Sequence, residues 1–327
     1  MSTTEKKYLD FEKPLEEIEK QILDLQELRK KRNVDNQLQI TQLQQLFREK
    51  TKEIYSNLTA WQKVQIARHP YKPHTGDYIE GLIENFFELH GDRICGDDSA
   101  IIAGIGKFRG RSVAVIGHQK GKDTDENIRR NFGMAHPEGY RKALRIMKLA
   151  EKFSFPVITL VDTPGAHPHI EAEERNQALA IANNIYQMSE IQTPIIVVII
   201  GEGGSGGALG IGVGDKIVML EFAIYSVISP EGCASILWKD QKAIREASES
   251  LRLTAPELLK LGLIDDIINE PPGGAHSQPG EMIKMLGDYL EKSIIELSTI
   301  EPGILIEKRY EKYRKIGFYN TLNQEKS

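Results

Sequence analysis

Two short and almost wholly apolar runs constrain the fold of this chain more than any other feature. They are residues 156–161 (PVITLV) and 194–200 (PIIVVII), and both are rich in β-branched side chains. Runs of this length and composition are typical of strands that are buried on both faces. Amphipathic patterns predict helices at residues 137–152 and 171–189. Because such strands alternate with helices, the sequence predicts an α/β fold with a parallel sheet covered on both faces.

Weaker patterns surround these runs. Residues 100–108 and 112–118 predict two strands joined by a tight turn centred on Gly110. Ser229 begins a helix well, because its hydroxyl can accept a backbone N–H bond and the proline after it suits a first turn. Further strands are predicted at residues 216–221 and 225–228, and further helices at residues 204–214, from Thr254 to Gly262 and at residues 280–300. The last residues of the chain, rich in Lys and Gln, are expected to fray.

Residues 8–60 have a different composition, with no glycine and a regular apolar stripe. The stripe recurs at spacings of four and three, which is typical of a helix that packs along another helix. Its members are Phe11, Leu15, Ile18, Ile22 and Leu25. A turn is predicted at residues 33–36, followed by a second helix that carries Leu38, Leu43, Leu46, Phe47 and Ile54. The sequence therefore predicts an antiparallel helical arm.

These shifts in composition divide the chain into three regions. Residues 1–75 are expected to form the arm, and residues 76–272 the α/β core. A proline- and glycine-rich break (PPGG) at residues 271–274 separates the core from a helical tail at residues 273–327.

Composition and charge exclude several classes of protein. The 327 residues are 40% apolar and 27% charged, as in a soluble globular protein. The net charge of −5 gives no electrostatic case for nucleic acid or an anionic membrane as a partner. The apolar runs are too short to span a bilayer, and the N-terminus lacks the apolar core of a signal peptide. Two distant cysteines support neither a disulfide framework nor a cysteine zinc site.

Two loops follow the two buried strands and could carry chemistry. The first loop is residues 162–166 (DTPGA), and the second loop is residues 201–207 (GEGGSGG). Ligands of an open α/β sheet bind outside the carboxyl ends of its strands. Glycines let a backbone approach a ligand, and the first N–H groups of a following helix are unpaired. We therefore expect a pocket for negative charge, either a phosphate or an oxyanion that forms during a reaction.

Two other interpretations of the second loop stay open on the residues alone. Gly201, Gly203 and Gly206 match the dinucleotide-binding pattern, with Glu221 about 20 residues further on, so NAD is one alternative. The small residues at 203–214 could also serve only close packing of helices or subunits. A Walker phosphate loop is excluded, because no glycine here precedes Lys-Ser/Thr.

Other side chains have a chemical and a plainer interpretation. His167 and His169 could bind a metal, but no third ligand stands at a suggestive spacing, so they are expected to line a surface or pocket. Asp162 could be a base, although fixing its loop by accepting backbone N–H bonds is favoured. Cys233 is expected to be a small packed residue. A basic cluster could bind phosphate or an acidic partner, or could be a solvated face: Lys120, Lys122, Arg129 and Arg130.

Many stretches of this chain, in order, resemble the alpha subunits of the multi-subunit acetyl-CoA carboxylase carboxyltransferases of bacteria and plastids. They run through most of residues 8–276. These stretches are ARHP (67–70), GDR (91–93), IGHQKG (116–121), RRNFGM (129–134), PEGYRKA (137–143), DTPGA (162–166), AEER (172–175), IGEGGSGGA (200–208), SVISPEGCASILW (226–238) and PGGAH (272–276).

The resemblance implies a crotonase/ClpP-like spiral of ββα units and an enzyme that is active only with a beta subunit, as α2β2. That partner would supply the acetyl-CoA site and a cysteine zinc ribbon, and no metal is expected in this chain. Carboxybiotin on a biotin carboxyl carrier protein, charged by an ATP-using biotin carboxylase, would donate its carboxyl group to acetyl-CoA. The product would be malonyl-CoA for fatty acid synthesis, in bacterial cytoplasm or plastid stroma.

The resemblance also implies a division of the site. The alpha side would hold the ureido oxygen of biotin through N–H groups of Gly206 or Gly207 and of Gly165 or Ala166. The biotin side would further include Gly203, Gly204 and Ser205. The family usually has an aromatic residue where His167 stands and glycine where His169 stands, which makes the first-loop donors less secure than the second-loop donors.

Two alternative functions accompany this interpretation. One is a carboxyltransferase or decarboxylase that acts on another acyl-CoA. The other is a non-catalytic assembly subunit whose arm organises a complex.

Overall fold

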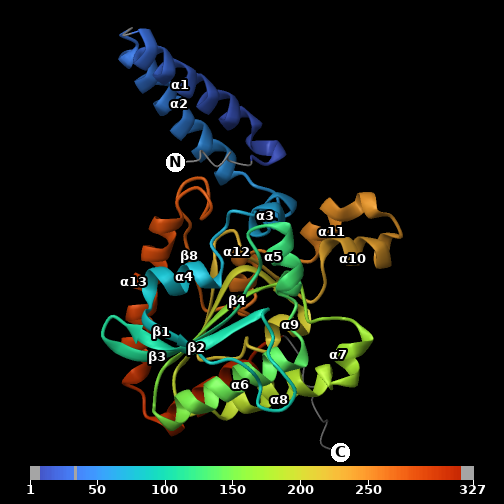
Figure 1. The fold of residues 1–327 in the computed structure, drawn as a ribbon. Helices are drawn as coiled ribbons and strands as arrows, with labels where there is room; N and C mark the ends of the chain where they lie inside the picture. Colours follow the sequence, from blue (N-terminus) through green and yellow to red (C-terminus); the bar gives the residue numbers. More distant parts are fainter. Residues whose placement is uncertain (1–7, 33–34, 318–327) are drawn as a thin grey trace, which may run out of the picture.

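The computed structural model describes residues 8–32 and 35–317, and in that part of the chain an eight-stranded sheet forms the centre (Figure 1). The strands are ordered β1-β2-β3-β4-β5-β6-β8, and β7 pairs with the far end of β5. The β1–β2 and β2–β3 pairs are antiparallel, and the other pairs are parallel. The strands are β1 (Glu84–Glu88), β2 (Ile101–Phe108), β3 (Arg111–His118), β4 (Val157–Thr163), β5 (Ile195–Gly204), β6 (Lys216–Leu220), β7 (Ile224–Ser226) and β8 (Asp266–Ile268).

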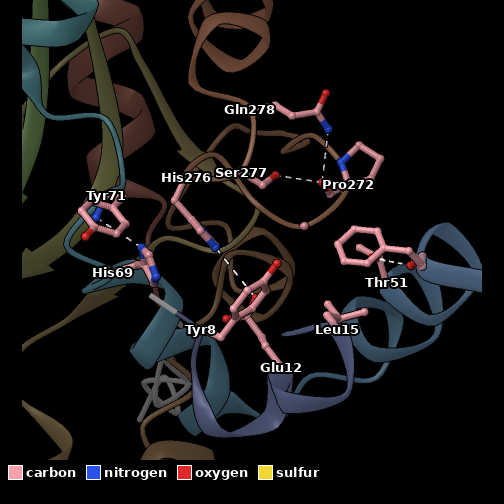
Figure 2. Close-up of a pocket in the computed structure, with 12 residues that line it drawn as sticks. Tyr8, Glu12, Leu15, Thr51, His69, Tyr71, Pro272, His276, Ser277 and Gln278 are labelled. Atoms are coloured by element: carbon pink, nitrogen blue, oxygen red, sulfur yellow. Dashed lines mark hydrogen bonds and ion pairs between the residues drawn. The ribbon is translucent and has the colours of Figure 1, made fainter. Parts of the chain in front are cut away.

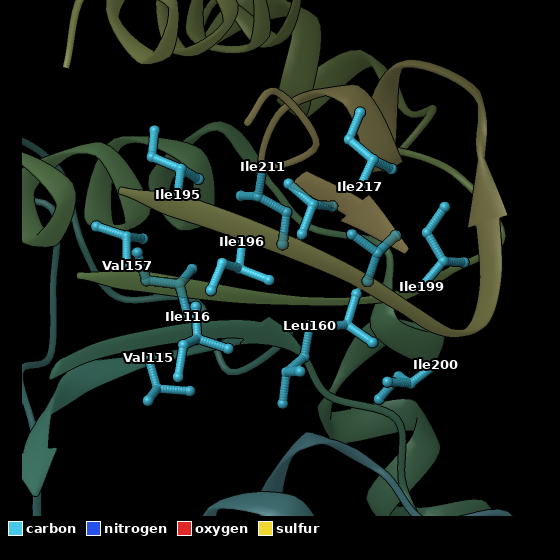
Figure 3. Close-up of a cluster of buried hydrophobic side chains, with 14 of the residues drawn as sticks. Val115, Ile116, Val157, Leu160, Ile195, Ile196, Ile199, Ile200, Ile211 and Ile217 are labelled. Atoms are coloured by element: carbon cyan, nitrogen blue, oxygen red, sulfur yellow. The ribbon is translucent and has the colours of Figure 1, made fainter. Parts of the chain in front are cut away.

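Helices cover both faces of the sheet, as the apolar strands predict. Helices α6 (Pro137–Lys152) and α8 (Gln177–Glu190) pack together on one side, and α4 (Thr75–Leu82) and α13 (Pro279–Ser298) on the other (Figure 1). Every residue from Val157 to Thr163 is buried, and Figure 3 shows the valine and isoleucine side chains that fill the core around β3, β4 and β5. The predicted α/β class and the crossovers between parallel strands are confirmed.

Shorter elements connect these layers. Ser229 caps α10 by accepting the N–H of Gly232 at 3.1 Å, as predicted. Residues 124–129, for which the sequence predicts no element, form the short helix α5. These connecting elements are α3 (Ala60–Ala67), α5 (Thr124–Arg129), α7 (Ile170–Glu174), α9 (Ser205–Leu209), α10 (Pro230–Cys233), α11 (Ile244–Ser250) and α12 (Ala255–Lys260), with 3-10 turns at Asp10–Glu12, Asn131–Gly133 and Gln241–Ala243 and a π-helical turn at Ala234–Trp238.

Three predicted boundaries are wrong. The helix expected at residues 171–189 is broken into α7 and α8 by Asn176, whose φ of 66° is left-handed. Strand β5 does not end at residue 200 but continues through Gly204, because β7 pairs with its last three residues. The helix expected at residues 204–214 is only the five residues of α9, and β1 was not predicted at all.

The predicted arm is a helical hairpin of α1 (Lys13–Arg32) and α2 (Gln37–Ser56), which stands away from the body (Figure 1). Leu15 and Ile22 of the expected stripe are buried, and Ile40 joins them from α2. Leu38 and Leu46, expected to face the partner helix, are exposed instead. Residues 33 and 34 of the expected turn lie outside the described residues. The proposed boundaries at residues 75 and 272 stay predictions.

Helix α14 (Pro302–Arg314) follows α13 within the expected helical tail, and residues 318–327, at the end where fraying is expected, lie outside the described part. Arg309 fixes this helix to the body, and its side chain is fully buried. Its guanidinium donates to Asp215 at 2.7 and 2.8 Å and to the backbone oxygens of residues 188, 191 and 193. No helix in the described residues is long and apolar enough to cross a membrane.

The contacts of Arg309 give a first prediction. Arg309→Met removes the partner of a buried carboxylate, which typically costs about 3–5 kcal/mol. We expect a clear fall in the free energy of unfolding, measured by urea denaturation. Arg314→Met, at an exposed position at the end of the same helix, is the control and should change stability by less than about 0.5 kcal/mol. Equal stability of the two variants would contradict the anchoring role.

His118, at the end of β3, gives a second prediction. Its ring is fully buried, and burial lowers its pKa to about 3. The unfolded chain takes up a proton on His118 near pH 6.5 and the folded chain does not, so folding stability falls as pH decreases below that value. By pH 5 this group alone should remove about 2 kcal/mol. We expect His118→Gln to flatten the pH dependence of unfolding between pH 7 and 5 by that amount, whereas parallel curves would refute it.

Candidate functional site

The first and second loops lie against each other at the carboxyl ends of β4 and β5. These strands are parallel neighbours, as predicted. A Cβ added to Gly204 would overlap the carbonyl group of Pro164, and one added to Gly207 would overlap the backbone of Gly165. Glycine is therefore required at both positions so that the two loops can touch. Close packing therefore explains these two glycines, but it is packing between two loops and not between helices or subunits.

Backbone donors without partners lie on both loops. The N–H groups of Gly206 and Gly207, in the first turn of α9, and that of Ala166 form no hydrogen bond within the described part of the chain. The N–H of Gly165 donates a hydrogen bond to the hydroxyl oxygen of Thr163 at 3.2 Å. A Cβ on Gly165 would meet no atom within 4 Å, and one on Gly206 would meet only a side-chain methyl at 3.7 Å. Ala166, Gly206 and Gly207 thus carry backbone donors that have no partner among the described residues, and their role as ligand donors stays a prediction.

The remaining glycines of the second loop have structural partners. Gly203 and Gly204 are the end of β5 and pair with Tyr225 and Ser226 of β7. Ser205 starts α9 with a left-handed φ of 47°. Their assignment to the biotin side stays a prediction.

A buried network of charges lies beneath the two loops and was not predicted as a unit. Lys120 Nζ lies 2.7 Å from Asp162 Oδ1 and 2.8 Å from Glu202 Oε2. Arg68 Nε lies 2.6 Å from Glu202 Oε1, and its Nη1 lies 2.6 Å from Glu231 Oε1. The network therefore joins one residue of each loop to α10 and to the segment after α3.

The cations of this network hold its carboxylates in the ionised form. Burial opposes the charge of Asp162, but Lys120 and His74 outweigh it and hold the pKa of Asp162 well below its usual range. Burial likewise opposes the charge of Glu202, whose pKa is lowered by Lys120 and Arg68. In return, the two carboxylates raise the pKa of Lys120 despite its burial. Carboxylates stabilised in this way are weak bases, so neither is suited to proton abstraction.

Asp162 fixes its loop, which is the role favoured over a base. Between the pairs Val161–Ile199 and Thr163–Gly203, β4 contributes one residue and β5 contributes three. This bulge leaves the N–H of Glu202 without a regular partner, and Asp162 Oδ1 accepts it at 3.0 Å.

A cavity of about 290 Å³ opens beside the network and Pro164. A second cavity, of about 220 Å³, lies where the arm meets the body (Figure 2). There the buried carboxylate of Glu12 accepts a hydrogen bond from the Tyr55 hydroxyl and lies 3.8 Å from His276 Nε2. The rings of His69 and His276 stack with centroids 3.9 Å apart. The contacts that hold the arm on the body thus lie around this second cavity.

In the structure, the four cations of the basic cluster pair with different carboxylates. Lys120 is buried in the network, whereas Lys122 pairs with Asp77 at the surface. Arg129 and Arg130 both approach Glu126. Each of the four cations therefore has an acidic neighbour in this chain, and their role as a phosphate or acidic-partner site stays a prediction.

The histidines of the first loop form part of a ring cluster. His167 is buried, and its ring centroid lies 4.0 Å from that of His136 and 4.8 Å from that of His169. Asn131 Nδ2 lies 2.7 Å from His167 Nδ1. Among the described residues, no three or more His, Cys, Asp or Glu side chains are placed to hold a metal ion. Cys233 is buried in a small apolar cluster, as expected.

The dinucleotide alternative does not fit this geometry. Gly201 and Gly203 lie inside strand β5 and not in a turn. A Cβ on Gly201 would overlap the Asp162 carboxylate, one on Gly203 would overlap the Tyr225 ring, and Glu221 accepts the N–H of Glu270 at 3.1 Å.

Solved structures of similar fold include a malonate decarboxylase and a transcarboxylase. A chain of a Pseudomonas malonate decarboxylase hetero-tetramer in complex with coenzyme A matches with a TM-score of 0.57 at 13% identity, over 72% of this chain and 92% of that one. Transcarboxylase 12S matches with a TM-score of 0.53 at 20% identity over 65% of this chain, which spans only 41% of the 12S chain. At these identities the likeness supports the fold alone, and the predicted crotonase-like fold is confirmed.

Sequence relatives are much closer. The acetyl-coenzyme A carboxylase carboxyl transferase subunit alpha of Anoxybacillus flavithermus is 55% identical over 309 residues, which cover 94% of this chain and 95% of that protein. The subunit of the same name from Halalkalibacterium halodurans is 53% identical over 315 residues, which cover 96% and 97%. The family described as acetyl co-enzyme A carboxylase carboxyltransferase-like matches residues 8–317. On this evidence the chain belongs to the acetyl co-enzyme A carboxylase carboxyltransferase family, as its motifs predicted.

Proposed function

We propose that this chain is the alpha subunit of an acetyl-CoA carboxylase carboxyltransferase, which moves a carboxyl group from carboxybiotin to acetyl-CoA and so forms malonyl-CoA for fatty acid synthesis. The observation that carries the proposal is that Ala166, Gly206 and Gly207, whose N–H groups have no partner among the described residues, lie on two loops in contact. Relatives at 52–55% identity over nearly the whole chain bear that name, which supports the choice of reaction.

The donor set fits an oxygen that gains negative charge. Biotin, when bound, supplies a ureido oxygen that takes up charge as its carboxyl group departs. The role of this chain is to hold that oxygen with the N–H groups of Gly206 or Gly207 and of Ala166. Gly165 is a weaker candidate than Ala166, because its N–H is shared with Thr163. Preorganised donors of this kind typically lower a barrier by about 3–4 kcal/mol each.

The proposal includes partners and a location. A beta subunit, in an α2β2 assembly, would bind acetyl-CoA and complete the site, because the paired Asp162 and Glu202 leave this side without a suitable base. A biotin carboxyl carrier protein would bring the biotin, and a separate biotin carboxylase would use the ATP. This chain would need no metal of its own. We propose the cytoplasm of a bacterium as its location, with the plastid stroma as the alternative.

The decisive test uses Gly207→Ala in the complex with the beta subunit. The added methyl group overlaps the backbone of Gly165 and must separate the two loops. We expect carboxyl transfer between malonyl-CoA and biocytin to fall by about 100-fold or more, at unchanged assembly by gel filtration.

Gly280→Ala is the matched control, because a Cβ there meets no atom within 4 Å. It should retain wild-type activity. Full activity of an intact Gly207→Ala complex would exclude the catalytic role and leave the assembly-subunit alternative. Activity of the wild-type complex with a different acyl-CoA, and none with malonyl-CoA, would support the alternative substrate class.

A further inference from the structure

The distance between the two loops depends on a residue that belongs to neither of them. Lys120 follows β3, two residues after its last residue, and most of its side chain is buried. Its ammonium group contacts Asp162, the residue that begins the first loop, and Glu202, the second residue of the second loop. One cation therefore joins the two loops.

We propose that Lys120 is a positioning residue for carboxyl transfer, whose ammonium group holds the carboxylates of Asp162 and Glu202 together and so sets the spacing of the two loops. This inference rests on the proposed function, since the N–H donors of that function lie on the same loops. Lys120 itself is not assigned a contact with substrate.

The backbone around Lys120 is built to hold its side chain in place. Gln119 Nε2 donates to the Lys120 backbone oxygen at 2.7 Å, and the N–H of Gly121 donates to Asn127 Oδ1 at 3.0 Å. Gly133, with a φ of 76°, passes so close that an added Cβ would lie 3.1 Å from Lys120 Cγ and 2.9 Å from the Asp162 backbone oxygen. The ammonium group is thus held in place by the segment after β3, which belongs to neither loop.

The two carboxylates would repel each other without this cation. Both accept from the same nitrogen, at 2.7 and 2.8 Å, and both are buried. Like charges in a low-dielectric interior either separate or take up a proton. Without Lys120, Arg68 would still pair with Glu202 through Oε1, whereas Lys120 contacts Oε2. Arg68 makes no ion pair with Asp162, so it cannot join the two carboxylates.

If Asp162 and Glu202 separate, the loops that carry the N–H donors are displaced with them. Glu202 also donates its own N–H to Asp162, so the bulge that carries the second loop opens if the carboxylate moves. Gly204 and Gly207 lie in backbone contact with the first loop and have no space to absorb a shift. A displacement of about 1 Å in such a site can cost about 100-fold in rate.

The test compares Lys120→Met with wild type in the complex with the beta subunit. We expect kcat for carboxyl transfer to fall by about 100-fold, whereas KM for malonyl-CoA, a ligand of the partner, changes by less than about threefold. The loss should shrink as pH is lowered from 8 to 6, because a proton shared by the two carboxylates replaces the missing cation. The charged and titratable groups that face this position are Asp162, Glu202, Arg68, Glu231, His74 and His118.

Matched variants separate positioning from folding. Lys120→Met combined with Glu202→Gln removes one unpaired charge and should regain at least about tenfold of the lost kcat, and Lys120→Arg should retain more activity than Lys120→Met. Lys122→Met, at an exposed lysine two residues away, is the control and should behave as wild type.

Several results would overturn the inference. Wild-type kcat in Lys120→Met would do so. So would a loss that is equal at every pH and is not relieved by Glu202→Gln, because that pattern indicates a general folding defect. Failure of the wild-type complex to transfer carboxyl groups at all would instead refute the proposed function, so the two ideas fail in different ways.

Discussion

The hydrogen bond from the Glu202 backbone to the Asp162 side chain is the interaction on which the rest of the site depends. The bulge that gives β5 extra residues against β4 frees that N–H, and the carboxylate closes the gap. A carboxylate buried at a strand end requires a cation, which explains why Lys120 reaches in from a third segment. The same carboxylate leaves no space for a Cβ at residue 201, so Gly201 is also a consequence of this bond.

Glycine is required in the second loop for two different structural reasons. At Gly204 and Gly207 it permits backbone contact with the first loop, and at Gly206 it leaves an open approach to an unpaired N–H group. The sequence pattern could not separate these two reasons, because both produce the same residue. The spacing of the glycines favours the dinucleotide alternative when taken alone, and the structure removes that alternative because Gly201 and Gly203 lie inside strand β5.

Much of the fold could be predicted because its signals are local. The two apolar runs became β4 and β5, and the arm followed from the stripe that includes Leu15 and Ile22. The tail was expected to be helical, but the bounds of α14 and its docking on the body were not predicted, because its buried anchor is Arg309, a residue that normally indicates a surface. The charge network was missed because its members are separated by tens to more than a hundred residues, and no spacing links Arg68 or Lys120 to Glu202.

The arm at the other end of the molecule has a mechanical consequence. A helix of 20 residues, such as α1, extends about 30 Å, so a tilt of about 10° at its base would move its tip by about 5 Å. At the base, Glu12 lies 3.8 Å from His276 of the body, and the ring of Tyr55 packs edge-on against Phe222. A small rotation at the base of the hairpin therefore produces a much larger displacement at its tip. A partner bound at the tip would move farther than one bound to the body of this subunit.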